Sequence, residues 1–308
     1  MTDVVQLQRR LRVALQNDDH AAAIDCLKEA AQLAHQAGDR AAEGRHLGNL
    51  ALLYNRLGQP HDALRCFERA LQLVRADGDR VTEDGLLGNM GNILRELRRF
   101  DEARDYLHAA LQIAAEIGDV RGRGIWLSNL GLVHDDLGQP EQAIEYHSQS
   151  IVVARQLRDQ RGLAARLRKL SDSFLSAGNP IEALKCLGEA LTIYTDINDQ
   201  QEMLDGLIAG AGIHSDLGRA AQTPPEARIY FQNALDYYRH ALSLAHAQAK
   251  RTAEALVLAR MGDVLLTTGD HTSALVHLQL AHQLCGELGM TEWQTAVAHS
   301  LQQLTQVK

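Results

Sequence analysis

Apolar residues recur along this chain at three- and four-residue steps, in segments that end at a glycine. Leu50 and Tyr54 lie on one face of such a segment, and the same spacing returns in residues 63–71. This periodicity is typical of amphipathic helices. Gly58 separates the two segments at a position where glycine tolerates the left-handed backbone that ends a helix. Pro60 follows at the first position of the next segment, where a helix accepts proline. The pattern therefore predicts a helical hairpin.

The predicted hairpin returns every forty residues. Gly38-Asp39 is repeated at residues 78–79 and 118–119, and the pair decays to Arg158-Asp159 and Asn198-Asp199. Each aspartate is placed to cap the following helix through its carboxylate. A fixed period of this size predicts stacked hairpins, each burying its apolar face against its neighbours. The hairpins expected are at about residues 3–37, 41–77, 81–117, 121–157, 161–197, 201–248 and 252–288, followed by a capping helix at 291–307.

The sixth hairpin is longer than the others. Gly218 and the equivalent Gly269 are 51 residues apart, which is an insertion of eleven relative to the forty-residue period. The insertion falls near residues 219–230 and includes Pro224-Pro225. We expect it to lengthen the second helix of that hairpin at its start, after a short loop.

The pattern of small and large residues resembles that of tetratricopeptide repeats. Its matching positions in the second hairpin are Leu50, Ala51, Tyr54, Gly58, Ala63, Phe67 and Ala70. The forty-residue variant is similar to repeats of Pins/LGN-type adaptors and kinesin light chains, although it lacks the early tryptophan and the final proline of the standard motif. The resemblance implies an all-α fold: a right-handed superhelical solenoid of seven hairpins plus a C-terminal capping helix, with residues 1–308 as a single solenoid.

Composition and charge narrow the classes of function. The 31 basic and 39 acidic residues give a net charge of −8, which argues against general nucleic-acid binding. No apolar run is long enough to span a bilayer, and residues 1–10 do not resemble a signal peptide. We therefore expect a cytoplasmic protein that neither enters a membrane nor binds nucleic acid.

Neither the cysteines nor the histidines form a recognisable reactive site. Cys26, Cys66 and Cys186 occupy equivalent positions of different hairpins, too far apart for a disulfide, and are interpreted as packing residues. His134 and His214 occupy the Tyr54 position and are likewise expected to pack. No zinc-protease or phosphate-loop pattern occurs. The sequence therefore predicts no enzyme, no metal and no cofactor.

A column of asparagines is the sharpest candidate for binding. Asn49, Asn89 and Asn129 occupy one position of three successive first helices, although helix propensity disfavours asparagine there. A side-chain amide both donates and accepts, so such a row can pair with an extended peptide backbone. The resemblance implies this role, because similar asparagines hold peptides in the concave groove of related repeats. The alternatives are that the amides bond between adjacent helices or are inherited by duplication.

Basic and polar residues surround the asparagines at the same predicted face. They would give a mixed groove on an acidic molecule, and an acidic or amphipathic peptide fits it by charge complementarity. Ordinary solvated surface is the alternative. The candidate groove residues besides the asparagines of the column are Arg45, Asn55, Arg56, Asn92, Arg95, Arg168, Lys169 and Arg260.

Aromatic residues gather at the insertion of the sixth hairpin. Tyr230, Phe231 and Tyr237 lie close together there, beside Tyr238, which belongs to the regular apolar column. They are expected either to pack the added helical turns onto the fifth hairpin or to form an exposed patch. An exposed patch would bind a partner or allow self-association.

Two functions of different classes remain open from the sequence. The first is a protein-interaction scaffold that binds a peptide or helical segment of a partner in a concave groove. The second is a sensory or regulatory arm that binds a small ligand or controls an effector domain.

Overall fold

The structure is a computed structural model that describes residues 4–306. Residue 3, at the predicted start of the first hairpin, and Val307, in the predicted capping helix, lie outside the described residues. Within the described range the chain is all-α, and its regular elements are fifteen helices. The backbone divides into two compact units, Met1–Arg158 and Asp159–Lys308, and each is described by itself.

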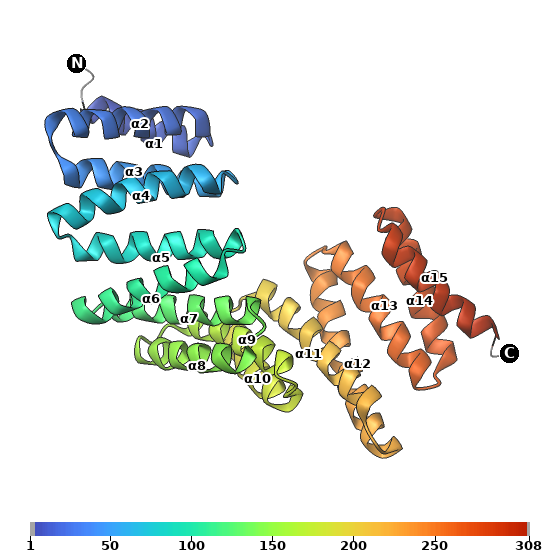
Figure 1. Cartoon of the computed structure of the whole chain (residues 1–308). Coiled ribbons are helices and arrows are strands. Elements are labelled where there is room, and N and C mark those ends of the chain that lie inside the picture. The colour runs from blue at the N-terminus through green and yellow to red at the C-terminus, as the bar shows by residue number, and fades with distance from the viewer. Residues whose placement is uncertain (1–3, 307–308) are drawn as a thin grey trace. The chain divides into compact units, whose positions relative to one another are not determined.

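The first unit consists of four consecutive helical pairs. Each pair packs on the next through its second helix and the first helix of the following pair, and Figure 1 shows the pairs following one another in chain order. The helices are α1 (Val4–Gln16), α2 (His20–Ala37), α3 (Arg40–Arg56), α4 (Pro60–Asp77), α5 (Arg80–Glu96), α6 (Phe100–Ile117), α7 (Val120–Asp136) and α8 (Pro140–Gln156).

The second unit continues the pattern with three pairs and a final helix. The last helix packs against both members of the third pair. The helices are α9 (Gln160–Ser176), α10 (Pro180–Asp196), α11 (Gln200–Ala220), α12 (Pro224–Ala247), α13 (Arg251–Thr267), α14 (His271–Glu287) and α15 (Thr291–Gln306).

The predicted helix ends are confirmed at the turns between pairs. Gly78 has φ +68°, the left-handed conformation expected of a terminating glycine. The Asp79 carboxylate then accepts the backbone N–H of Thr82 at 3.1 Å, which caps α5. The turns without glycine keep the same geometry, with φ +53° at Arg158 and +54° at Asn198. The left-handed turn is therefore kept without glycine, and at Ala249-Lys250 it is kept without a capping side chain as well.

Alanine and one large residue fill the space within each pair. In α4, Ala63, Phe67 and Ala70 are fully buried, as the repeat pattern predicts. The glycines of the first helices serve the same close packing. A Cβ added at Gly91 would lie 2.6 Å from Leu107 Cγ, so only glycine lets α5 and α6 approach this closely.

The insertion in the second unit lengthens two helices, not one. α11 has 21 residues and α12 has 24, four more than α9 and seven more than α10, which accounts for all eleven inserted residues. The expectation that the second helix grows is confirmed for α12, whereas the growth of α11 was not predicted. Gly218 does not end a helix as Gly58 does. It lies inside α11, where the ring of Phe231 packs against it.

An indole joins α7 to α5 in the first unit. Trp126 is 7% exposed, and its Nε1–H donates to Asp84 Oδ1 at 2.7 Å. A Cβ at Gly88 would lie 2.2 Å from the Trp126 ring, so the ring occupies space that only glycine leaves open. The three residues fix the separation of the two helices.

Burial raises the pKa of the Asp84 carboxyl above its ordinary value of 3.8, although the hydrogen bond from Trp126 opposes the shift. A carboxyl with a raised folded-state pKa stabilises the fold most below its unfolded pKa, and this contribution is lost as pH rises through the folded pKa. We expect Asp84→Asn, which keeps an acceptor for Trp126, to gain stability relative to wild type across that pH window. Urea denaturation at pH 4 to 8 measures this difference.

The exposed Asp105→Asn substitution, on α6, is the matched control for that series. The difference in unfolding free energy between Asp105→Asn and wild type should not change with pH in the way expected for Asp84→Asn. A flat difference between Asp84→Asn and wild type across the whole pH range would contradict the assignment of a raised pKa to Asp84.

The cysteines are separate thiols within the helices. Cys26 and Cys285 are buried, whereas Cys66 and Cys186 are half-buried, and none of the four forms a disulfide with another described residue. Burial raises the pKa of the Cys66 and Cys285 thiols, which disfavours the reactive thiolate. Among the described residues, no helix combines the length and apolar character that a membrane span requires.

Candidate functional site

The three asparagines of the predicted column lie on one surface of the first unit. α3 presents Arg45, Asn49, Leu52 and Arg56 at steps of four, three and four residues, and all four side chains are exposed. This spacing places them along a single helical stripe. The equivalent stripes of α5 and α7 complete what we call the asparagine face, whose other residues are Gly85, Asn89, Asn92 and Glu96 on α5 and Ile125, Asn129, Leu132 and Asp136 on α7.

The asparagine amides have no hydrogen-bond partner among residues 4–306. Asn49 is exposed, and Asn89 and Asn129 are half-buried. None of the three makes a side-chain hydrogen bond to any residue in the described part of the chain. The interhelical bonds required by one alternative interpretation are therefore not formed there, and the donors and acceptors remain open to solvent or a ligand.

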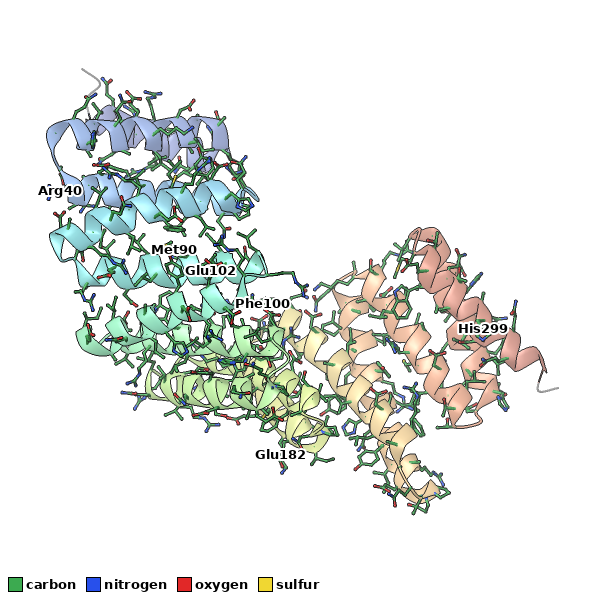
Figure 2. All side chains as sticks on the ribbon, viewed as in Figure 1. Arg40, Met90, Phe100, Glu102, Glu182 and His299 are labelled. Atoms are coloured by element: carbon green, nitrogen blue, oxygen red, sulfur yellow. The ribbon has the colours of Figure 1, made fainter. Side chains whose placement is uncertain are left out.

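A buried residue follows each asparagine and holds its backbone in place. Leu50, Met90 and Leu130 are 3% exposed or less, and Met90 packs into the core between α4, α5 and α7. Figure 2 labels Met90 on α5. The amides therefore stand on rigid helices, which limits the entropy that a bound ligand would have to remove.

Two contacts fix the separation of the helices that carry Asn89 and Asn129. The Trp126–Asp84 hydrogen bond joins them near the start of each helix. Arg95 Nη1 donates to Asp136 Oδ2 at 2.9 Å near their ends. The distance between these two asparagines is thus set by contacts outside their own row.

The charges of the asparagine face are distributed unevenly. Arg45 and Arg56 on α3 have no ion pair or hydrogen bond through their side chains among the described residues. Arg95, which the sequence places among the available basic groups, is already paired with Asp136. The unpaired positive charge therefore lies at the α3 end, on either side of Asn49. Asn55, also predicted at this surface, is half-buried on α3.

The remaining predicted basic residues belong to the second unit. Arg168 and Lys169 are half-buried on α9, and Arg168 Nε lies 3.6 Å from Glu202 Oε2 of α11. Arg260 on α13 places its guanidinium 5.4 Å from the centre of the Trp293 ring. Both arginines thus have partners in their own unit, which the sequence alone did not predict.

The aromatic residues of the insertion pack against α11. Phe231 is 7% exposed and contacts Gly218, so it cannot contribute to an exposed patch. The rings of Tyr230 and Tyr237 lie 6.1 and 5.3 Å from that of His214. The expected packing on the fifth hairpin is therefore corrected: these rings contact α11 of their own hairpin. Phe231 packs at Gly218, in the added residues of α11, whereas the two tyrosines pack at His214, in its regular part.

The two histidines expected to pack are confirmed as packing residues. His134 is buried and stacks on Tyr146 with ring centres 5.1 Å apart, and its Nδ1 lies 2.8 Å from Gln139 Oε1. His214 is buried between its two tyrosines, and this burial lowers the pKa of its imidazole. Among the described residues, no cluster of three or more histidine, cysteine or carboxylate side chains is arranged to hold a metal ion.

A family model described as tetratricopeptide repeat matches residues 12–76, 83–156 and 123–196. These matches cover more than half of the chain. The chain belongs to the tetratricopeptide repeat family. No curated protein matches the chain significantly by sequence.

Solved structures share the fold of this tetratricopeptide repeat chain at low sequence identity. A signal-transduction ATPase with a tetratricopeptide repeat sensor, from Pyrococcus horikoshii, is 16% identical with a TM-score of 0.75; the match covers 93% of this chain and 43% of that one. A putative kinesin light chain of TPR-like repeats from Podosopora anserina is 17% identical (TM-score 0.54), covering 64% and 99%. A Rap protein complexed with competence and sporulation factor is 15% identical (TM-score 0.56), covering 98% and 85%.

The predicted resemblance to kinesin light chain repeats is thereby confirmed at the level of the fold. This chain spans less than half of the length of the ATPase. Identities of this size establish a shared architecture, whereas the chemistry of the asparagine face depends on this chain's own residues.

Two features of the first unit escaped the sequence analysis. One is the Trp126–Asp84 contact between successive first helices, and the other is a cavity beside His46. Both involve the same position of the repeat. Successive hairpins have His46, Leu86, Trp126 and Arg166 at that position. The change in side-chain size along this column was the available signal.

Proposed function

We propose that this chain is a non-enzymatic interaction scaffold that binds an extended peptide segment of a partner along the asparagine face of its first unit. The observation that carries the proposal is the row of three amides, which make no side-chain hydrogen bond in the described part of the chain and are held on rigid helices. Each amide can donate to a peptide carbonyl and accept from a peptide N–H, which is the pairing an extended backbone offers.

The geometry of stacked helices suits such a ligand. Packed helices lie roughly 8–10 Å apart, and an extended chain rises about 3.3 Å per residue. α5 packs directly on α7, so about three residues of peptide would span the step from Asn89 to Asn129. Leu52, which is 48% exposed beside Asn49, offers an apolar contact for a side chain of that peptide.

The charge pattern favours one orientation of the ligand. Arg45 and Arg56 supply unpaired positive charge on α3, whereas Glu96 lies at the end of α5 and the charge of Asp136 on α7 is already paired with Arg95. An amphipathic peptide with its acidic residues over α3 would satisfy these arginines. Electrostatic complementarity of this kind contributes mainly to specificity and association rate.

A regulatory arm is the second candidate. It is supported by the similarity in fold to an ATPase whose tetratricopeptide repeats form a sensor, and to a Rap protein complexed with competence and sporulation factor. A regulatory arm could use the same face, with the bound peptide acting as a signal. The two candidates differ in whether peptide binding changes the activity of another domain.

A peptide-library selection tests the proposed site. Random peptides displayed on phage would be selected on the full chain and counter-selected on a variant with Asn49, Asn89 and Asn129 all replaced by alanine. We expect the surviving peptides to share acidic and apolar positions and to compete with one another. A selection that yields only peptides bound equally by the counter-selection variant would contradict the proposal.

A further inference from the structure

A cavity of about 210 Å³ lies between α1, α2 and α3. Its floor is buried and apolar, with Leu7, Cys26 and Ala34 all less than 9% exposed. Its lining also includes the exposed Ala37 and Asp39 and the half-buried His46. All of these residues belong to the first unit, and none of them is part of the asparagine face.

The repeat itself shows what this space can hold. Eighty residues further along, Trp126 occupies the position of His46, and Gly122 occupies that of Ala42. The indole of Trp126 packs there in the core cluster that includes Ile113 and Ala114, at the positions of Leu33 and Ala34. One hairpin thus fills this inter-helix space with its own indole, whereas the first two hairpins leave it as a cavity.

The lining differs from that of the third hairpin at other positions as well. Gln8 stands where the third hairpin has Gly88, so the flexible Gln8 side chain must turn aside for an indole-sized ring to enter. Ala37 stands where the third hairpin has Ile117, and Cys26 stands where the third hairpin has Tyr106. Both replacements remove volume from the same space. An aliphatic-lined cavity of about 150 Å³ can stay dry and bind benzene. Binding of an apolar ligand in a cavity of this kind is therefore expected to be favourable.

We propose that the cavity is a binding site for a small, neutral, flat aromatic molecule of about the size of indole. The shape of the ligand is given by the Trp126 side chain in the equivalent space. The apolar floor excludes a charged ring, because transferring an unpaired charge onto it would cost far more than the contacts return.

His46 supplies the polar contact for such a ligand. Its imidazole is half-buried and has no hydrogen-bond partner in the part of the chain that the structure describes. Burial, with a smaller effect from Arg45, lowers the pKa of His46, so the ring is neutral near pH 7. A neutral imidazole can accept from a ring N–H or donate to a ring acceptor. This site is independent of peptide binding at the asparagine face.

Indole itself is the probe for this inference. It would be titrated into the full ¹⁵N-labelled chain, with amide shifts followed by NMR, beside N-methylquinolinium as a flat ring that is itself charged. We expect saturable shifts centred on residues 26–46 with indole, and affinity for N-methylquinolinium lower by about tenfold or more, which corresponds to about 1.4 kcal/mol.

Two variants that fill the cavity provide the decisive comparison. His46→Trp and Ala37→Ile introduce the side chains that Trp126 and Ile117 place in the equivalent space, and each should weaken indole binding about tenfold or more. Ala76→Ile makes the same change at an exposed position of α4 and should bind indole as wild type does. If His46→Trp does not fold, Ala37→Ile still decides the matter.

The result that would overturn the inference is equally specific. Absence of saturable shifts at residues 26–46 would show that the cavity takes no such ligand. Equal indole affinity in wild type and in every folded cavity-filling variant would show that any bound indole lies elsewhere.

Discussion

Trp126→Ala is expected to lower the free energy of unfolding of the first unit by about 3–5 kcal/mol, the usual cost of deleting a buried indole. The ring fills the space above Gly88 and joins the core cluster of α4–α7. Its removal leaves a cavity between two rigid helices and also leaves the buried Asp84 carboxylate without its donor. Each loss is costly, because the neighbouring backbone cannot collapse into the space.

Trp126→Phe separates the two contributions. Phenylalanine retains much of the ring but cannot donate to Asp84, so we expect a smaller loss, of about 1–3 kcal/mol for the unpaired buried acceptor. Gly88→Ala approaches the same contact from the other side, since its Cβ would lie 2.2 Å from the ring. It should also destabilise, through overpacking.

Hydrogen exchange on the full chain is the suitable measurement for these variants. Exchange reports local stability, so amides of α5–α7 should lose protection in Trp126→Ala while those of the second unit keep theirs. Unchanged protection in α5–α7 would show that the indole is not the contact that holds these helices together.

The second large effect concerns ligand binding. Replacing Asn49, Asn89 and Asn129 together with alanine is expected to weaken a peptide that binds the asparagine face by about 1.5–4.5 kcal/mol, taking roughly 0.5–1.5 kcal/mol for each lost hydrogen bond. This corresponds to a loss of affinity between about tenfold and a thousandfold. The loss would be larger if a buried peptide group were left unpaired.

The same substitution should not harm the fold. The three amides make no hydrogen bond within the described residues, and alanine is a better helix former than asparagine by a few tenths of a kcal/mol at each position. The variant should therefore unfold at the same urea concentration as wild type or slightly above it. Asn233→Ala, at a half-buried position within α12 of the second unit, offers a matched helical substitution away from the face.

The helical hairpins were predictable because each hairpin carries its own boundaries in its residues. Pro60 begins α4, Gly78 adopts the left-handed conformation after it, and Asp79 caps α5. These are local effects that depend on neighbours in sequence. Because the pattern repeats every forty residues, the prediction of one helical hairpin also predicted most of the other helices.

The growth of α11 was not predicted because a glycine can either end a helix or make room for a side chain of a neighbouring helix. Gly218 was taken as a helix end, by analogy with Gly58, whereas it lies within α11 and accepts the ring of Phe231. The two uses differ only in what packs against the glycine, and that depends on a residue of the next helix. Local sequence does not contain this information.

The candidate surface was predictable in position but not in its pairing. The helical period places Asn49, Arg45 and Arg56 on one stripe, as observed. The pairing of Arg95 with Asp136 joins residues 41 apart, so it depends on how closely α5 and α7 pack. The cavity beside His46 likewise depends on the volumes of side chains from three helices.

The central claim is that the three asparagine amides bind a ligand and do not support the fold. The most direct test measures, on one preparation of the triple alanine variant, both its urea midpoint and its affinity for a peptide selected on the wild-type chain. We predict an unchanged or slightly higher midpoint together with affinity reduced about tenfold or more. A lower midpoint with unchanged affinity would contradict the account, because it would show that the asparagines stabilise the helices and do not contact the peptide.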